Sequence, residues 1–278
     1  MPVDNDIMLF SIINTFNKTL GVDICDDSKK YLKSNSKKFS KLGSIDKIYY
    51  TKYSGQIAQS LMDYLEKITL FEINTDPDNE IVHDFKVTWK KNNVAHISLS
   101  HASINTRDVI PEKLMKICGY KKNTNVCKAY TESYQKINDK GYGKVKSKTK
   151  YSEISDKSKE KAILEPTRNL VLATIGKKKK HSQKLYDHLF GETDRIVFRL
   201  YKNRYAMYDF GKELGTVEGY VKMKLDKDDN IVVTFNNKTN FSLCLQTNAT
   251  EIKPHLSMKF KTTFTNMDEL FIVASASV

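Results

Sequence analysis

The sequence predicts a mixed α+β or α/β protein, and three observations support this fold class. Apolar residues recur at helical spacing in several N-terminal segments, which predicts amphipathic helices. Three short apolar runs between residues 69 and 100 are separated by turn-forming residues, which predicts three consecutive strands. From residue 195 onwards, apolar and polar residues alternate with a period of two, which predicts antiparallel strands. The 278 residues suffice for a sizeable core, in one two-lobed domain or two small domains.

The predicted elements follow from local spacing, capping and turn residues. The first helix is expected to be capped by Asp4 or Asp6 and stopped by Gly21. Helices are expected, in chain order, at residues 4–20, 54–68, 111–120, 162–175 and 185–190. Strands are expected at residues 69–73, 81–89, 94–100, 196–201, 221–225, 231–235, 241–246 and 256–264.

Composition divides the chain into three parts. Residues 1–135 contain the N-terminal helices and the first strands. Residues 136–161 are rich in lysine and poor in apolar residues, which predicts a linker or mobile loop. Residues 162–278 contain a helical pair and a strand-rich part, and we expect them to pack on the first part.

The charge balance favours a polyanionic partner. Lysine and arginine total 46 against 33 acidic residues, which gives a net charge of +13 and a pI near 9.3. Almost all of the basic residues are lysines, which act as point charges on phosphate, whereas arginine forks onto base edges. An AT-rich coding sequence is an equally good explanation of the lysine excess.

Several protein classes are excluded by the composition. No apolar run approaches the ~20 residues of a membrane span, and residues 7–13 lack the flanks of a signal peptide. The four cysteines form no CxxC pair, so neither a zinc knuckle nor a disulfide framework is indicated. We therefore expect an intracellular protein with idle thiols and no membrane partner.

One local cluster has the residue types of a metal-dependent phosphodiesterase. Side chains on a strand repeat every two residues, so Asp84 and Lys86 share a face that Glu72 on the preceding strand can also face. Carboxylates on adjacent strands hold hard ions such as Mg²⁺, which polarise a phosphate oxygen. Glu72 and Asp78 are the candidates for a second metal ligand beside Asp84. The alternative is an ordinary surface lysine and a carboxylate near a turn, because such triplets are common in this composition.

Two segments resemble the HaeIII-type family of type II restriction endonucleases, which carry the PD-(D/E)xK nuclease fold. Val82-His83-Asp84 is similar to the family's aspartate step, and residues 97–102 (ISLSHA) are similar to its strand I-G-L-S-x-K. Residues 241–260 resemble the C-terminal strand pair of the family, with its N-A-S/T and P-S-L-K-F stretches. The resemblance implies a mixed sheet flanked by helices, an additional antiparallel part, and Mg²⁺-dependent, sequence-specific hydrolysis of double-stranded DNA with Asp84 on the metal.

The sequence departs from this family at the catalytic lysine. Ala102 stands at that position, and a methyl group can neither bind a phosphate nor orient a water. Three explanations stay open at this point. The protein is an inactive relative that binds DNA, or an active-site variant, or Lys86, Lys90 or His101 has taken over the role of the lysine.

DNA contacts are expected from two sets of basic residues. Arg195, Arg199 and Arg204 are the candidates for reading guanine edges, and the alternative for them is an ion pair on a strand face. The candidates for backbone phosphates are Lys177, Lys178, Lys179, Lys180, Lys90 and Arg107. A homodimer and a monomer that nicks each strand in turn are both open. The competing hypothesis is a non-catalytic basic protein that binds nucleic acid.

Overall fold

The computed structural model of the chain consists of two compact units. Unit 1 comprises Met1–Asn105, Glu192–Glu213 and Glu269–Val278, and unit 2 comprises Thr106–Gly191 and Leu214–Asp268. The residues whose structure is described are 4–74, 83–90, 92–101, 106–145, 153–176, 182–191, 195–210, 217, 221–247, 258–266 and 272–277.

Unit 1 begins with three helices. They are α1 (Asn5–Asn14), which continues into the π-helical turn η1 (Thr15–Thr19), then α2 (Asp26–Ser40) and α3 (Ser44–Leu65). The predicted cap is confirmed, because the Asp4 carboxylate accepts the backbone N–H of Asp6 at 3.0 Å and of Ile7 at 3.2 Å. Helix α3 begins ten residues before the predicted start. Its first turns bury Tyr50 and Tyr53, and a search for aliphatic periodicity does not detect these aromatic side chains.

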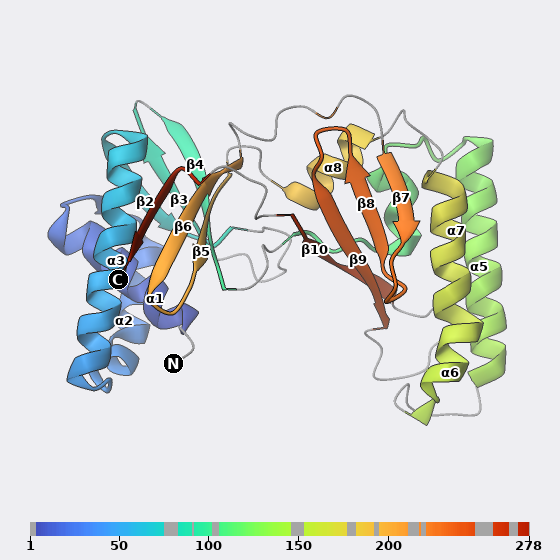
Figure 1. Cartoon of the computed structure of the whole chain (residues 1–278), viewed down its shortest axis with the longest axis horizontal. Helices are drawn as coiled ribbons and strands as arrows, with labels where there is room; N and C mark the ends of the chain where they lie inside the picture. Colours follow the sequence, from blue (N-terminus) through green and yellow to red (C-terminus); the bar gives the residue numbers. More distant parts are fainter. Residues whose placement is uncertain are drawn as a thin grey trace. The chain divides into compact units, whose positions relative to one another are not determined.

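The strands of unit 1 form one mixed sheet. They are β1 (Asp23–Ile24), β2 (Ile68–Ile73), β3 (Phe85–Trp89), β4 (Asn93–Ser100), β5 (Arg195–Leu200), β6 (Arg204–Asp209) and β11 (Ala274–Ser277). Their order is β1-β2-β3-β4-β5-β6-β11 (Figure 1). The pairs β1–β2 and β4–β5 are parallel, and the other neighbours are antiparallel.

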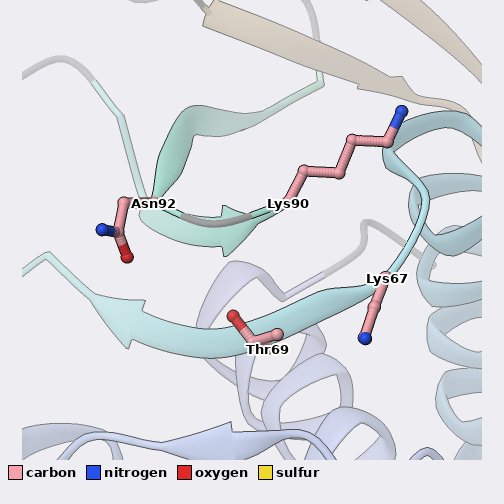
Figure 2. A pocket seen from close by; sticks show the side chains of 4 residues that line it. All are labelled: Lys67, Thr69, Lys90 and Asn92. Carbon is pink, nitrogen blue, oxygen red and sulfur yellow. The ribbon is translucent and has the colours of Figure 1, made fainter.

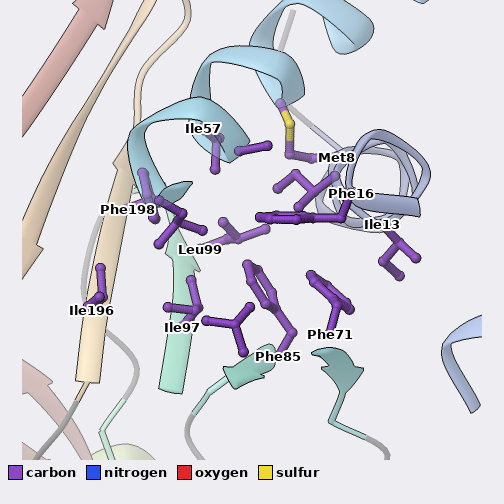
Figure 3. Close-up of a cluster of buried hydrophobic side chains, with 14 of the residues drawn as sticks. Met8, Ile13, Phe16, Ile57, Phe71, Phe85, Ile97, Leu99, Ile196 and Phe198 are labelled. Carbon is purple, nitrogen blue, oxygen red and sulfur yellow. The ribbon is translucent and has the colours of Figure 1, made fainter. Parts of the chain in front are cut away.

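The core of unit 1 lies between this sheet and the helices. Phe71, Phe85, Leu99 and Phe198 point from four adjacent strands towards the helices (Figure 3). Phe16 of η1 meets Phe71 with a ring-centroid distance of 5.4 Å. Because strand side chains alternate between the two faces, the same register directs the intervening polar residues to the opposite face of the sheet.

Unit 2 combines helices with a purely antiparallel sheet. Its helical segments are η2 (Pro111–Lys113), α4 (Leu114–Ile117), α5 (Asn125–Val145), α6 (Asp156–Lys159), η4 (Glu160–Leu164), α7 (Glu165–Ile175) and α8 (Ser182–Phe190). Its strands are β7 (Val221–Leu225), β8 (Ile231–Phe235), β9 (Asn240–Thr247) and β10 (Met258–Phe264), in the order β10-β9-β8-β7. Tyr186 and Phe190 of α8 pack on Phe241 of β9 with ring-centroid distances of 6.3 and 5.9 Å.

The structure confirms the coarse fold class and corrects the predicted division of the chain. A mixed sheet and a separate antiparallel sheet are both present. The predicted linker at 136–161 is wrong in part: α5 runs through it to Val145, and Asp156–Leu164 is helical. Strands β5 and β6 belong to the mixed sheet of unit 1 rather than to the C-terminal antiparallel part, because β5 pairs in parallel with β4. The predicted boundaries at 135 and 162 therefore fall inside unit 2.

None of the helices in the described part of the chain is both long enough and apolar enough to cross a bilayer.

Candidate functional site

A row of polar side chains crosses four strands on the face of the unit 1 sheet that points away from the core. The strand register places Glu72 opposite Lys86, Lys86 opposite His96, and His96 opposite Arg195. These residues come from β2, β3, β4 and β5 in turn. The row thus brings an acid, a lysine, a histidine and an arginine together from distant parts of the chain.

Asp84 lies at the edge of this row, immediately before β3. Its backbone N–H donates to the carbonyl of Ile97 at 2.8 Å, and its Oδ2 accepts the backbone N–H of Leu99 at 2.6 Å. These two contacts fix the carboxylate against β4. Burial raises the pKa of Asp84, and the Leu99 N–H and the Arg195 charge oppose this shift. A carboxylate held in this way is an electrostatic partner for a nearby cation.

The cation in the structure is Arg195, which is completely buried at 0 % exposure. Its Nε donates to the hydroxyl of Ser98 at 2.9 Å, and its charge acts on Asp84. A guanidinium keeps its proton even when it is buried, so Arg195 is charged. This position corrects the predicted DNA-reading role of Arg195, since a side chain without exposed area cannot reach a base edge.

Lys86 and Glu72 form an ion pair beside this group. Lys86 Nζ lies 3.4 Å from Glu72 Oε2, and the two side chains are 38 % and 28 % exposed. The structure therefore places Glu72, Asp84 and Lys86 on one face, as their spacing predicts. The Lys86 ammonium is paired with the Glu72 carboxylate, so each charge is partly compensated by the other.

Three histidines lie in or near the row, and they do not form one cluster. The rings of His83 and His96 lie 4.5 Å apart between centroids. His101, at the end of β4, contacts the side-chain oxygen of Asn5 through Nε2, and burial lowers its pKa. The predicted catalytic candidate His101 is thus engaged with the first turn of α1.

The remaining predicted DNA contacts are dispersed. Arg199 and Arg204 flank the ring of Tyr201, with guanidinium carbons 5.3 and 4.7 Å from its centroid. Lys90 pairs with Glu66 at 2.6 Å. Arg107 belongs to unit 2, where its backbone N–H donates to the carbonyl of Leu189. Six predicted site residues lie outside the described residues, namely Asp78, Ala102, Lys177, Lys178, Lys179 and Lys180.

The predicted Mg²⁺ site is described only in part, because Asp78 lies outside the described residues. Within the part of the chain that the structure describes, no group of three or more histidine, cysteine, aspartate or glutamate residues can hold a metal ion. Asp84 is the one acid held against β4 by a backbone N–H of Leu99, and it shares its surroundings with the positive charge of Arg195. A divalent cation at this carboxylate meets electrostatic repulsion from the guanidinium.

Sequence reasoning did not identify Ser98 as a site residue or Arg195 as an interior one. One signal was present, since polar residues occupy alternate positions of β4 at Ser98 and Ser100, which are 1 % and 5 % exposed. Buried polar residues on a strand with a buried apolar face indicate that both faces are covered.

Comparison with known proteins gives one full-length relative. The chain is 39 % identical over 298 aligned residues to the uncharacterized protein R607 of Acanthamoeba polyphaga mimivirus, and the alignment covers 100 % of both chains. No protein-family model matches the chain.

Proposed function

The chain belongs to the same family as the mimivirus protein R607, and we propose that it binds double-stranded DNA through a nuclease-like unit that does not hydrolyse it. In this proposal unit 1 is related to the PD-(D/E)xK core, and Arg195 supplies the positive charge that a metal ion supplies in a nuclease. The proposal combines three supports, which concern the fold, the site and the charge.

The fold supports a relationship to the restriction-endonuclease core. Unit 1 has a mixed sheet flanked by helices, as the resemblance implies. Asp84 immediately precedes β3, and its carboxylate accepts a backbone N–H of the neighbouring strand β4, which carries the second stretch of similarity. The described parts of these two stretches in unit 1 are therefore adjacent in space.

The buried pair of Arg195 and Ser98 beside Asp84 carries the non-hydrolytic part of the proposal. A buried charge requires compensation, and here the guanidinium is compensated by the Ser98 hydroxyl and the field of Asp84. The chain itself thus supplies, through Arg195, a positive charge that compensates the Asp84 carboxylate. The charge of Lys86 is likewise partly compensated by Glu72.

The surface charge supports a nucleic-acid partner. The net charge of +13 favours association with a polyanion. The excess of cations over acids in the whole chain carries this support, because Lys29, Lys30 and Lys38 of α2 are paired with Asp26, with Asp27, and with Asp4 and Asp6.

Two measurements test the proposal. Fluorescence anisotropy with a labelled duplex of about 25 base pairs, at several salt concentrations, is expected to show binding that weakens linearly in log Kd against log salt. Plasmid incubated with the protein and Mg²⁺ or Mn²⁺ is expected to stay intact. Metal-dependent nicking or cleavage would instead establish the endonuclease, with Glu72, Asp84 and Lys86 as its first candidates. Absence of duplex binding even at low salt would refute DNA as the partner.

A further inference from the structure

A cavity at one end of the unit 1 sheet is separate from the Asp84 site. It has a volume of about 660 Å³ and is lined by Lys67, Thr69, Lys90 and Asn92. Figure 2 shows that these residues come from the start of β2 and from the turn between β3 and β4. All four lining residues are exposed, so the cavity is open to solvent.

The backbone around this cavity is strained. Among the described residues, six other than glycine have positive φ. Four of them frame the cavity, with φ of 46° at Glu66, 54° at Lys67, 35° at Lys90 and 90° at Asn92. Side chains with a Cβ disfavour this region, which glycine adopts freely. Retention of long lysine side chains at two such positions indicates a role for the side chains, since strained backbone concentrates at functional sites.

A second irregularity occurs on the same edge. The register between β2 and β3 shifts between Ile68 and Leu70, which places Thr69 in a β-bulge. The Thr69 hydroxyl donates to the carbonyl of Thr88 at 3.2 Å and also lines the cavity. Bulges redirect side chains and are over-represented next to functional sites.

The lining has the chemistry of an oxyanion site. It offers two ammonium groups, a hydroxyl and a side-chain amide. Glu66 neutralises Lys90 through an ion pair of 2.6 Å, so the excess positive charge comes from Lys67. In Figure 2 the Lys67 side chain extends beside Thr69, away from the side chain of Lys90. The Thr69 hydroxyl already donates to Thr88, so the Lys67 ammonium and the Asn92 amide are the donors that suit a phosphate group, whose oxygens all accept hydrogen bonds.

We propose that this cavity binds a phosphate group, with Lys67 as the principal cation and Asn92 as a hydrogen-bond donor. We further infer that the phosphate is part of a DNA backbone, a step that rests on the DNA-binding function proposed above. The volume exceeds that of a single phosphate, which agrees with a phosphate that belongs to a larger molecule. A free nucleotide is the other source of the same chemistry.

The test uses the full chain with three substitutions at one position and one matched control. Lys67→Ala removes the charge, Lys67→Arg keeps it, and Lys67→Gly removes it while relieving the positive φ. Lys33→Ala removes one exposed charge from α2, far from this cavity in the sequence. Far-UV circular dichroism and urea unfolding check the fold. Lys67→Gly is expected to be at least as stable as the wild type, because glycine suits this φ.

Phosphate binding is measured with inorganic phosphate and with ATP, by amide NMR shifts of residues 67–69, 90 and 92. The wild type, Lys67→Arg and Lys33→Ala are expected to show saturable shifts, and Lys67→Gly and Lys67→Ala to lose them. Equal shifts in the wild type and Lys67→Gly, or no saturable shift in the wild type, would overturn the phosphate site. This arm is independent of DNA binding.

The DNA arm measures the salt dependence of duplex binding. Loss of a phosphate contact at Lys67 is expected to reduce the slope of log Kd against log salt by about 0.9, and Lys33→Ala to change it less. Saturable phosphate shifts together with unchanged duplex binding in Lys67→Gly would overturn the DNA backbone as the source and identify a free phosphorylated ligand. If the wild-type protein binds no duplex, the proposed function is refuted. The NMR measurement with inorganic phosphate and ATP still tests whether the cavity binds phosphate.

Discussion

Replacement of Arg195 by methionine tests whether the buried guanidinium holds the candidate site together. In the wild type, Arg195 donates a 2.9 Å hydrogen bond to Ser98, and its positive charge compensates Asp84. Methionine fills much of the same volume but can do neither. Removal of one partner from a buried charged pair costs about 3–5 kcal/mol. We expect a loss near the lower end, about 3 kcal/mol, because Asp84 can take up a proton once its cation is gone.

The single tryptophan, Trp89, makes this measurement specific to unit 1. It lies at the end of β3 in the same sheet, so urea unfolding followed by its fluorescence reports on the strands that hold the site. The cost of Arg195→Met is expected to be smaller at pH 4 than at pH 8, because a protonated Asp84 does not need the cation. The double variant Arg195→Met with Asp84→Asn is expected to recover part of the loss at pH 8.

Two results would refute this reasoning. A cost of Arg195→Met below about 1 kcal/mol at pH 8 would show that the guanidinium is not a compensated buried charge. A double variant no more stable than Arg195→Met would show that Asp84 and Arg195 are not coupled. Ser98 loses its hydrogen bond from Arg195 equally in both Arg195→Met variants, so this loss cancels when the single and double variants are compared.

Three further predictions use urea unfolding or thiol labelling. Burial raises the pKa of Asp84 in the folded state, so its ionisation disfavours folding. Asp84→Asn is therefore expected to gain stability relative to the wild type as the pH rises above 3.8, the ordinary pKa of aspartate. A difference in stability that does not change with pH would contradict this prediction. Burial raises the pKa of Cys118 to about 12, so iodoacetamide at pH 8 should label it only in urea, as peptide mass spectrometry can show; rapid labelling of the folded chain would exclude the buried thiol. Tyr53→Phe should cost about 1–3 kcal/mol in urea unfolding, since the Tyr53 hydroxyl accepts the N–H of Tyr201 and contacts the carbonyls of Tyr201 and Arg204; an unchanged midpoint would refute that role.

The elements whose pattern lies within a short stretch of sequence were predictable. The β7–β8 hairpin follows from alternating residues on both sides of a polar turn, where Asp226 accepts the N–H of Asp228 and Asn230 at 2.9 Å. Helix α5 was not predicted. It buries Tyr130, Tyr134 and Asn138 at intervals of four residues, and these side chains do not stand out in a polar, lysine-rich composition.

The candidate site was predictable only within single strands. Alternation correctly places Asp84 and Lys86 on one face. The pairing of β4 with β5 depends on tertiary structure, so neither the register of His96 with Arg195 nor the contact of Arg195 with Ser98 is encoded in a local pattern. In a strand with alternating polar and apolar residues, an arginine is expected to face solvent. Only the tertiary structure shows that the polar face of this strand is also buried at Arg195. The cavity at Lys67 depends on backbone conformation, which residue types alone do not indicate.

The insertion of unit 2 into unit 1 sets the order in which the chain can fold during synthesis. Ser98 and Arg195 are 97 residues apart, so β4 waits for its parallel neighbour while most of that interval is translated. At ~5–20 residues per second this delay is about 5–20 s. The edge strand β11 pairs with β6 only after residues 274–277 have emerged. Until then the sheet that carries Asp84 exposes an unpaired edge, so a nascent chain stalled before residue 195 is expected to depend on chaperones.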